Sequence, residues 1–451
     1  MVNKLNKLFK LKDEKSKTVF KNVFFSFFIK AINISVSFLT IPLVLSFLNT
    51  TQYGIWLTLT AILGWFSIFD LGFGNGLRNH LTIAIANKNH DDGRIYVSTT
   101  YAALSLVFGA ILIIFLMINP LINWRAVFNA PVEMSLDIQI AVTYSMCLLF
   151  VQFVLRLINN VLLAFQRSAM ADFINALVQV FILIGLYAVK LTPYHSLTAV
   201  ALVYSIMPVL VFLLLSVILY NKTYSYLTPK FTFVKFRHAK GLLNVGLNFF
   251  VIQIAALVLY ASDNFIIAQY FSPADVAVYN IAFKYFSVSN IIFSIVLAPF
   301  WSMTTKAYAE SDWKWIRATM KKLFMFWGLL ILLIIFQLIF SAPFYKIWTH
   351  NTVSVPLNLS IVMSLYYIIF TLGGIFSNFL NGVSKIRLQL YFATSSMFLN
   401  ILLAILFIKV FHMGVSGIPL ATTIVTALVS IISYIQYRKI TNLSATGIWN
   451  K

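Results

Sequence analysis

Apolar runs of about 20 residues recur along the whole chain, and they constrain its fold more than any other feature. Each run is long enough to cross a hydrocarbon core about 30 Å thick as an α-helix. The sequence predicts twelve such spans, at about residues 19–48, 52–87, 95–118, 138–165, 169–190, 197–220, 241–270, 275–305, 318–340, 355–381, 388–409 and 414–437. Only 10% of the residues are charged, whereas roughly a quarter is usual in soluble domains, so we predict an all-α polytopic membrane protein.

The positions of lysine and arginine predict the orientation of these spans, because cytoplasmic loops carry the excess of positive charge. Most of the 33 lie in the N-terminal segment, in alternate loops and after the last span. The opposite face carries only Arg125, Lys190, Lys346 and Lys409. Both termini are therefore predicted to be cytoplasmic. The net charge of +21 is then mainly a topology signal, and nucleic-acid binding is not expected.

The centre of the chain predicts a division into two halves. Residues 221–240, NKTYSYLTPKFTFVKFRHAK, are basic and contain Pro229, which is typical of a cytoplasmic linker. This linker separates an N-terminal six-helix bundle, residues 1–220, from a C-terminal six-helix bundle, residues 241–451. Because each half has six crossings, the halves share one orientation, which indicates a parallel repeat about an axis along the membrane normal.

Cationic residues lie deep within several spans, where a charge is costly and usually functional. We predict that Lys30, Arg156 and Lys284 line a substrate-binding cavity, together with Arg78. Arg78 sits where its span would emerge, so a role as a headgroup anchor is an equal alternative. Polar residues at helical spacing are predicted to line the same cavity: Asn22, Asn33, Gln152, Asn159, Asn160, Asn280, Tyr367 and Asn378. The other interpretation of each polar stripe is a contact that holds helices together.

Two carboxylates, Asp70 and Asp263, are also predicted within spans. Two interpretations stand: neutralisation of neighbouring cations, or uptake of a proton or Na⁺, since burial raises a carboxylate pKa and cations lower it. Asp263 is the preferred ion-coupling candidate, because Asp70 belongs to the glycine-rich stretch FDLGFG.

Several chemical classes find no support in the sequence. The chain has neither a Walker loop nor a dinucleotide fingerprint, so ATP hydrolysis and a bound cofactor are not expected. Cys147 is the only cysteine and the six histidines show no ligand spacing, so no metal site is expected either. We therefore expect a protein that is not an enzyme.

Several short motifs occur in an order that resembles a known family. They are Lys21-Asn22 at the start of the first span, Tyr53-Gly54-Ile55-Trp56, FDLGFGNGLRN at 69–79 followed by Ala84-Ile-Ala, Ala164-Phe165-Gln166-Arg167, and Asn381-Gly382-Val383-Ser384-Lys385. With the 6+6 layout, the chain resembles the bacterial polysaccharide-unit (O-antigen) flippases of the multidrug/oligosaccharidyl-lipid/polysaccharide exporter superfamily, over essentially its full length.

The resemblance implies a multi-pass protein of the bacterial inner membrane with a MATE-like fold that alternates between inward- and outward-open states. The implied substrate is an undecaprenyl-pyrophosphate-linked repeat unit of O-antigen lipopolysaccharide or another polysaccharide. Coupling to H⁺ or Na⁺, contact with membrane lipids, and a polysaccharide polymerase with its chain-length machinery as partners are implied in the same way. The predicted cations suit a pyrophosphate, and the polar stripes suit sugars.

Three alternatives remain. A lipid II flippase of the same superfamily would usually have fourteen spans rather than twelve. A multidrug or toxin exporter would more often have an acidic cavity. A polytopic O-antigen polymerase or ligase would be expected to carry a substantial extracytoplasmic loop with basic residues or histidine, and the longest such loop, about residues 119–137, is short.

Overall fold

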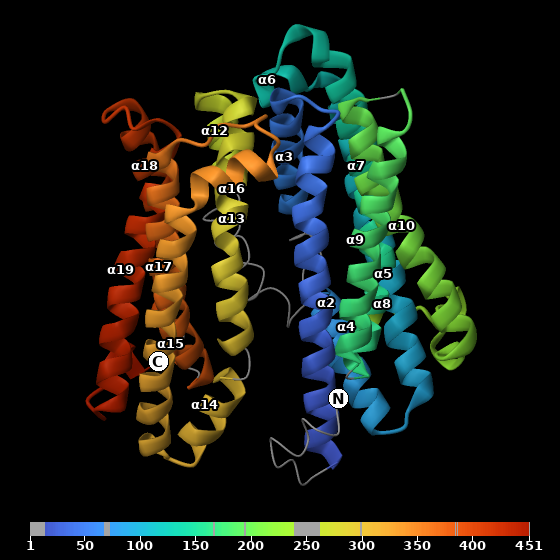
Figure 1. Ribbon diagram of the computed structural model, residues 1–451. Coiled ribbons are helices and arrows are strands. Elements are labelled where there is room, and N and C mark those ends of the chain that lie inside the picture. The colour runs from blue at the N-terminus through green and yellow to red at the C-terminus, as the bar shows by residue number, and fades with distance from the viewer. Residues whose placement is uncertain are drawn as a thin grey trace. The chain divides into compact units, whose positions relative to one another are not determined.

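The structure is a computed structural model that describes residues 14–66, 73–165, 167–193, 195–238, 262–297, 300–383, 385 and 387–450 (Figure 1). Throughout these ranges the regular secondary structure is helical, with no β-strand. Nine helical stretches within them are long and apolar enough to span a membrane. The chain is therefore an all-helical, multi-pass membrane protein, as the sequence predicts.

The chain divides into two compact units. Unit 1 comprises Met1–Asn49 and Leu63–Val251, and unit 2 comprises Thr50–Ile62 and Ile252–Lys451. The early helix α3 (Thr50–Trp65) thus belongs for most of its length to unit 2, although it lies in the first half of the sequence. The sequence does not predict this assignment, and the predicted boundary at residues 221–240 stays a prediction.

Unit 1 is built around long helices that bury small and branched apolar residues between them. Helix α10 packs against α7 and α9, α2 packs against α9, and α4 packs against α5 and α8. Its helices are α2 (Glu14–Leu45), α4 (Phe73–Ala86), α5 (His90–Ile118), α6 (Trp124–Phe128), α7 (Ser135–Leu155), α8 (Leu157–Ala164), α9 (Ser168–Lys190) and α10 (Leu197–Lys222). Five 3₁₀ turns accompany these helices in the described part of the unit. The last three, η4 (Ser225–Leu227), η5 (Phe231–Phe233) and η6 (Phe236–His238), follow α10 and lie against α5.

Unit 2 is organised around α17, which packs against α19, α13, α14 and α15, while α18 packs against α19. Its helices after α3 are α12 (Asp263–Tyr270), α13 (Pro273–Leu297), α14 (Phe300–Ala309), α15 (Trp313–Ile339), α16 (Ser341–Trp348), α17 (Leu357–Gly382), α18 (Arg387–Lys409) and α19 (Gly417–Thr441). The face of α17 toward these neighbours is buried and carries polar side chains, among them Ser364 and Thr371, beside the apolar ones.

Several predicted spans are divided in the structure. The prediction at 52–87 corresponds to α3 and α4, and the prediction at 275–305 corresponds to α13 and α14, with Pro299 in the sequence between the last two. The prediction at 138–165 corresponds to α7 and α8, which meet at Arg156. Residues 67–72, which include Asp70, and residues 241–261 of the predicted seventh span lie outside the described residues.

Candidate functional site

The short helix α12 and the helix α13 form a hairpin in unit 2 that positions a buried carboxylate. Asp263 is the first residue of α12. A negative charge at this position is stabilised by the dipole of the helix. The Tyr279 hydroxyl on α13 donates a hydrogen bond of 2.6 Å to Asp263 Oδ2. One residue further along both helices, Asn280 Nδ2 donates to Asn264 Oδ1 at 2.8 Å. Two successive polar pairs, each 16 residues apart in the sequence, therefore hold the hairpin together.

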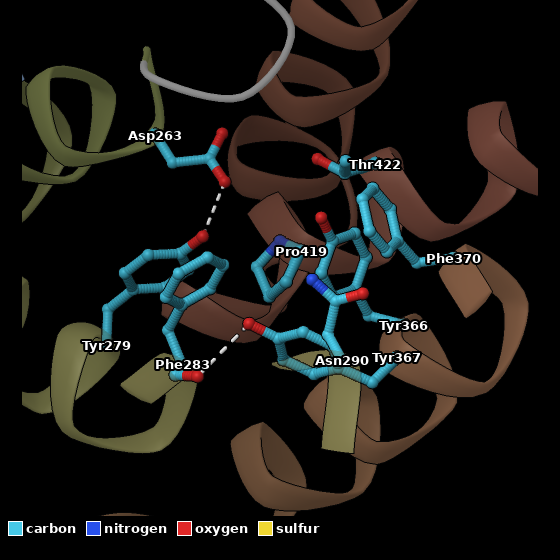
Figure 2. A pocket seen from close by; sticks show the side chains of 9 residues that line it. All are labelled: Asp263, Tyr279, Phe283, Asn290, Tyr366, Tyr367, Phe370, Pro419 and Thr422. Carbon is cyan, nitrogen blue, oxygen red and sulfur yellow. Dashed lines mark hydrogen bonds between the residues drawn. The ribbon is translucent and has the colours of Figure 1, made fainter. Parts of the chain in front are cut away.

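The Asp263 carboxylate is only half satisfied. The residue is 6% exposed, and its Oδ1 has no hydrogen-bond partner within the described residues. A buried charge without a full set of partners is costly, so such a group tends to bind a proton or a cation. Figure 2 shows Oδ1 pointing away from the Tyr279 hydroxyl.

A cavity of about 150 Å³ adjoins this carboxylate. It is lined by Asp263, Tyr279, Phe283, Asn290, Tyr366, Tyr367, Phe370, Pro419 and Thr422, which come from α12, α13, α17 and α19 (Figure 2). Pockets for organic ligands usually measure about 300–1,000 Å³, whereas a water molecule needs roughly 30 Å³ of liquid volume. The cavity thus has the size for a small ion with a few waters and is too small for an oligosaccharide.

The cavity wall is mainly aromatic. The Tyr367 hydroxyl donates to the backbone oxygen of Phe283 at 3.2 Å, which fixes α17 against α13. The ring centroids of Tyr366 and Tyr367 lie 4.9 Å apart, and those of Tyr366 and Phe370 lie 5.5 Å apart. Such ring pairs pack at preferred separations and leave few alternative rotamers. The wall therefore gives the carboxylate a rigid and largely apolar surrounding.

Three further predicted site residues lie near this cavity or on its helices. Asn280 is engaged with Asn264 and with the Val276 backbone oxygen, so its role in the structure is to tie the hairpin. Lys284 lies on α13 and is half-buried, without an ion pair in the part of the chain that is described. Asn378 also lies on α17, and its Nδ2 donates to the Gly374 backbone oxygen at 3.0 Å.

Five of the predicted residues of unit 1 lie on α4, on α7 and α8, or at the junction of α7 with α8. Asn159 is buried and its Nδ2 donates to Asn175 Oδ1 at 3.3 Å, which links α8 to α9. Arg156 is exposed at the junction of α7 and α8, and Arg78 is exposed on α4. Gln152 and Asn160 are half-buried. Two of the predicted cations of unit 1, Arg78 and Arg156, are therefore exposed, while Asn159 forms a contact between helices.

The first span contributes three further predicted residues on α2. Asn33 is half-buried, and its Oδ1 is buried without a hydrogen-bond partner in the described ranges. Lys30 and Asn22 lie on the same helix, but their side chains are outside the described part of the structure. Asp70 lies wholly outside it. The proposed roles of these residues stay predictions.

Sequence reasoning missed most of the cavity lining. Tyr279, Asn264, Asn290, Tyr366 and Thr422 were not predicted to belong to a site. One signal was available for the hairpin, since Asp263-Asn264 and Tyr279-Asn280 are two polar pairs at the same spacing. No signal of this kind connects α13 with α19, because their contact depends on tertiary packing alone.

Comparison with known protein families identifies two matches. The family model described as "Polysaccharide biosynthesis protein" matches residues 19–305. The model described as "MatE" matches residues 249–406. The first match covers more than half of the chain, and the second covers the part that contains α12, α13 and α17.

Curated relatives carry names from polysaccharide export. The chain is 23% identical over 287 residues to a "Putative O-antigen transporter" of Salmonella typhimurium, in a match that covers 63% of this chain and 65% of the relative. It is 20% identical over 365 residues to a "Putative O-antigen export protein" of Yersinia pseudotuberculosis, covering 79% of this chain and 82% of the relative. The match to the Salmonella protein therefore spans just under two thirds of its length.

Solved structures share the fold. An inward-facing multidrug resistance MATE family transporter of the MOP superfamily aligns with a TM-score of 0.77 at 14% identity, covering 91% of this chain and 94% of that one. A MOP superfamily transporter from Pyrococcus furiosus, described as having a binding pocket of reverse polarity, aligns with a TM-score of 0.65 at 14% identity, covering 95% and 97%. At these identities the likeness concerns the fold.

Proposed function

The chain belongs to the polysaccharide biosynthesis protein family, and from this membership we propose that it translocates lipid-linked polysaccharide repeat units across the bacterial inner membrane. The observation that carries the proposal is the family match over residues 19–305. The names of the Salmonella and Yersinia relatives support it. In the proposal, both termini are cytoplasmic and the transporter works by alternating access.

The proposed substrate is an oligosaccharide on undecaprenyl pyrophosphate, which combines a lipid tail, a charged bridge and a polar head. Lys30, Arg78, Arg156 and Lys284 are the groups proposed to offset the pyrophosphate, since cationic side chains form strong charge-assisted hydrogen bonds with phosphate oxygens. The exposure of Arg78 and Arg156 supports their availability for such a contact. The asparagines and glutamines of the polar stripes are proposed to contact the sugars.

We further propose that transport is coupled to H⁺ or Na⁺ at Asp263. The half-satisfied carboxylate and the adjoining cavity support a small monovalent ion as ligand. The carbonyl, carboxylate and hydroxyl oxygens that hard cations prefer are available there from Asp263, Asn290 and Thr422. Asp263 therefore remains the preferred coupling residue over Asp70.

A second function, export of drugs or toxins, is favoured by one observation, the match of the MatE model to residues 249–406. The cationic character predicted for the cavity weighs against it, because drug exporters of this fold more often receive cations.

Complementation distinguishes the two functions. The chain is expressed in a strain that lacks its O-antigen flippase and makes a matching repeat unit, and polymerised surface polysaccharide is measured. Restored polymer that is lost with Arg156→Ala supports a flippase with a cationic site. Arg125→Ala is the matched control, since Arg125 lies on α6 in the loop predicted to be extracytoplasmic. No rescue despite verified membrane insertion would contradict the proposal, and efflux assays would then test the drug-exporter function.

A further inference from the structure

The segment that follows α10, residues 223–238, presents an unusual combination of side chains. It has four aromatic residues besides Tyr224, which are Tyr226, Phe231, Phe233 and Phe236, and it contains no acidic residue. Lysines and an arginine alternate with these rings at Lys230, Lys235 and Arg237. Aromatic rings interleaved with basic residues are typical of segments that lie at a membrane–water interface.

Several polar contacts hold this segment against α5 in unit 1. Arg94 Nε donates to the Thr228 backbone oxygen at 3.1 Å, and the Arg94 guanidinium lies 4.5 Å from the Phe233 ring centre. The backbone N–H of Lys230 donates to Ser98 Oγ at 3.1 Å, and that of Lys235 donates to Thr99 Oγ1 at 3.0 Å. In Figure 1 the yellow-green segment turns back from α10 alongside α5. It is therefore a folded part of unit 1.

The contact with α5 places the segment at the height of the lipid headgroups. Helix α5 has 29 residues and is about 43 Å long, whereas the hydrocarbon core is about 30 Å thick. Its charged residues are all in the first turns, His90 to Arg94, so the excess of about 13 Å belongs to that end. Ser98 and Thr99 lie about 12–14 Å from His90 along the axis, close to the boundary between hydrocarbon and headgroups.

The outer surface of the segment is apolar and basic. Phe231 is 94% exposed and Phe236 is 53% exposed, although Leu227 and Tyr224 of the same segment are buried. Lys230 and Lys235 are exposed beside these rings. A nearly fully exposed phenylalanine is unfavourable in water. Its burial among lipids raises the equilibrium constant for membrane binding of the segment by more than about tenfold. Each lysine near an anionic membrane surface raises the same equilibrium constant by about fivefold.

We propose that residues 223–238 form an interfacial anchor that inserts Phe231 and Phe236 among the lipids and binds anionic headgroups through Lys230 and Lys235. The occupant is the cytoplasmic leaflet, because the exposed surface combines rings that fit the interface with positive charge that complements acidic lipids. This inference rests on the membrane location of the chain, on the contacts within unit 1 and on the cytoplasmic orientation of the termini in the proposed function. It does not rest on the nature of the transported substrate.

The first test uses the single native cysteine. In a Cys147→Ser background, Phe231→Cys is spin-labelled and the full-length protein is reconstituted into phosphatidylcholine vesicles with and without phosphatidylglycerol. With phosphatidylglycerol, the label is expected to be accessible to oxygen and shielded from a water-soluble nickel chelate. The control Asp91→Cys, in the first turn of α5, is expected to stay accessible to the chelate. A label at 231 that remains accessible to the chelate, or that is shielded from both reagents by protein contacts, would overturn the proposal.

The second test separates charge from insertion. Native mass spectrometry of the full-length protein with added phosphatidylglycerol is expected to show about a fivefold loss of bound lipid for each of Lys230→Gln and Lys235→Gln. Lys190→Gln and Lys346→Gln, on the predicted opposite face, make the same change of charge and are expected to have no such effect. Equal losses in both pairs would overturn the assignment to this segment.

Discussion

The contact of α3 with α13 in unit 2 leads to a sharp prediction for Gly54. A Cβ built on Gly54 would lie 1.5 Å from the Pro273 backbone oxygen and 2.4 Å from the Pro273 carbonyl carbon. Contacts of this kind below 3.0 Å are essentially never observed, so even alanine requires the two backbones to separate locally by about 1.5 Å. The obstacle is main chain and cannot move aside as a flexible side chain would. This close approach therefore explains why the second residue of the Tyr53-Gly54-Ile55-Trp56 motif is glycine.

The magnitude follows from two opposing effects. Overpacking of a well-packed interface costs typically about 1–3 kcal/mol, and more when backbone must shift. Replacing glycine by alanine within a helix returns at most about 1 kcal/mol. We therefore expect Gly54→Ala to destabilise the protein by about 2 kcal/mol, and Gly54→Val to destabilise it further because branching at Cβ enlarges the clash.

Thermal inactivation of the detergent-purified protein, followed by size-exclusion chromatography, measures this effect. Gly328→Ala on α15 is the matched control in the same unit, since a Cβ there meets nothing within 4 Å. It is expected to leave the midpoint unchanged or to raise it. A Gly54→Ala protein as stable as the wild type would refute the inferred close approach of α3 to Pro273.

Two other contacts in unit 2 give predictions of known sign. Tyr279→Phe removes the hydrogen-bond donor that stabilises the charged, ion-free Asp263 carboxylate. Ion binding is then more favourable, and we expect the ion concentration for half-maximal transport to fall about tenfold. A rise in that concentration would contradict the assignment of Asp263 as the coupling residue. Gln337→Leu on α15 removes the partner of the Ser289 hydroxyl and a hydrogen bond to the Tyr285 backbone oxygen. It is expected to destabilise the protein by about 1 kcal/mol, and Ser289→Ala in the same chain should recover part of that loss in thermal inactivation if the two side chains are coupled.

Much of the fold is predictable because long apolar runs leave few alternatives in a bilayer. The predicted spans at 197–220 and 388–409 differ by at most two residues at either end from α10 and α18. The break at Arg156 was not predicted, since neither proline nor glycine marks it. The assignment of α3 to unit 2 depends on contacts such as that of Gly54 with Pro273, which lie more than two hundred residues apart in the chain.

The candidate site was predictable only in part. Asp263 was found because a lone carboxylate in an apolar run is conspicuous, and Tyr367 because it belongs to a polar stripe. Their common cavity requires the α12–α13 hairpin and the packing of α17 and α19, which no local pattern encodes. Asn159, predicted to line a cavity, pairs with Asn175 between helices, because the same residue types serve both purposes in a membrane.

The small size of the Asp263 cavity leads us to expect that the coupling ion and the substrate are bound by two different sets of residues. A space of about 150 Å³ holds an ion but excludes a sugar chain, so ion coupling and substrate binding should be separable by mutation. Asp263→Asn keeps the shape of the side chain and removes its charge. We expect it to abolish the dependence of transport on a proton or Na⁺ gradient while the binding of lipid-linked oligosaccharide, measured without a gradient, stays within about twofold of wild type.

Arg156→Ala should do the reverse. It is expected to weaken binding of the lipid-linked oligosaccharide by at least about tenfold, since it removes a charge-assisted contact to phosphate, and to leave the ion concentration for half-maximal transport unchanged at saturating substrate. Both variants must insert into the membrane at wild-type levels for the comparison to hold. If Asp263→Asn abolished substrate binding in the absence of a gradient, the carboxylate would belong to the substrate site, and the division inferred from the size of the cavity would be wrong.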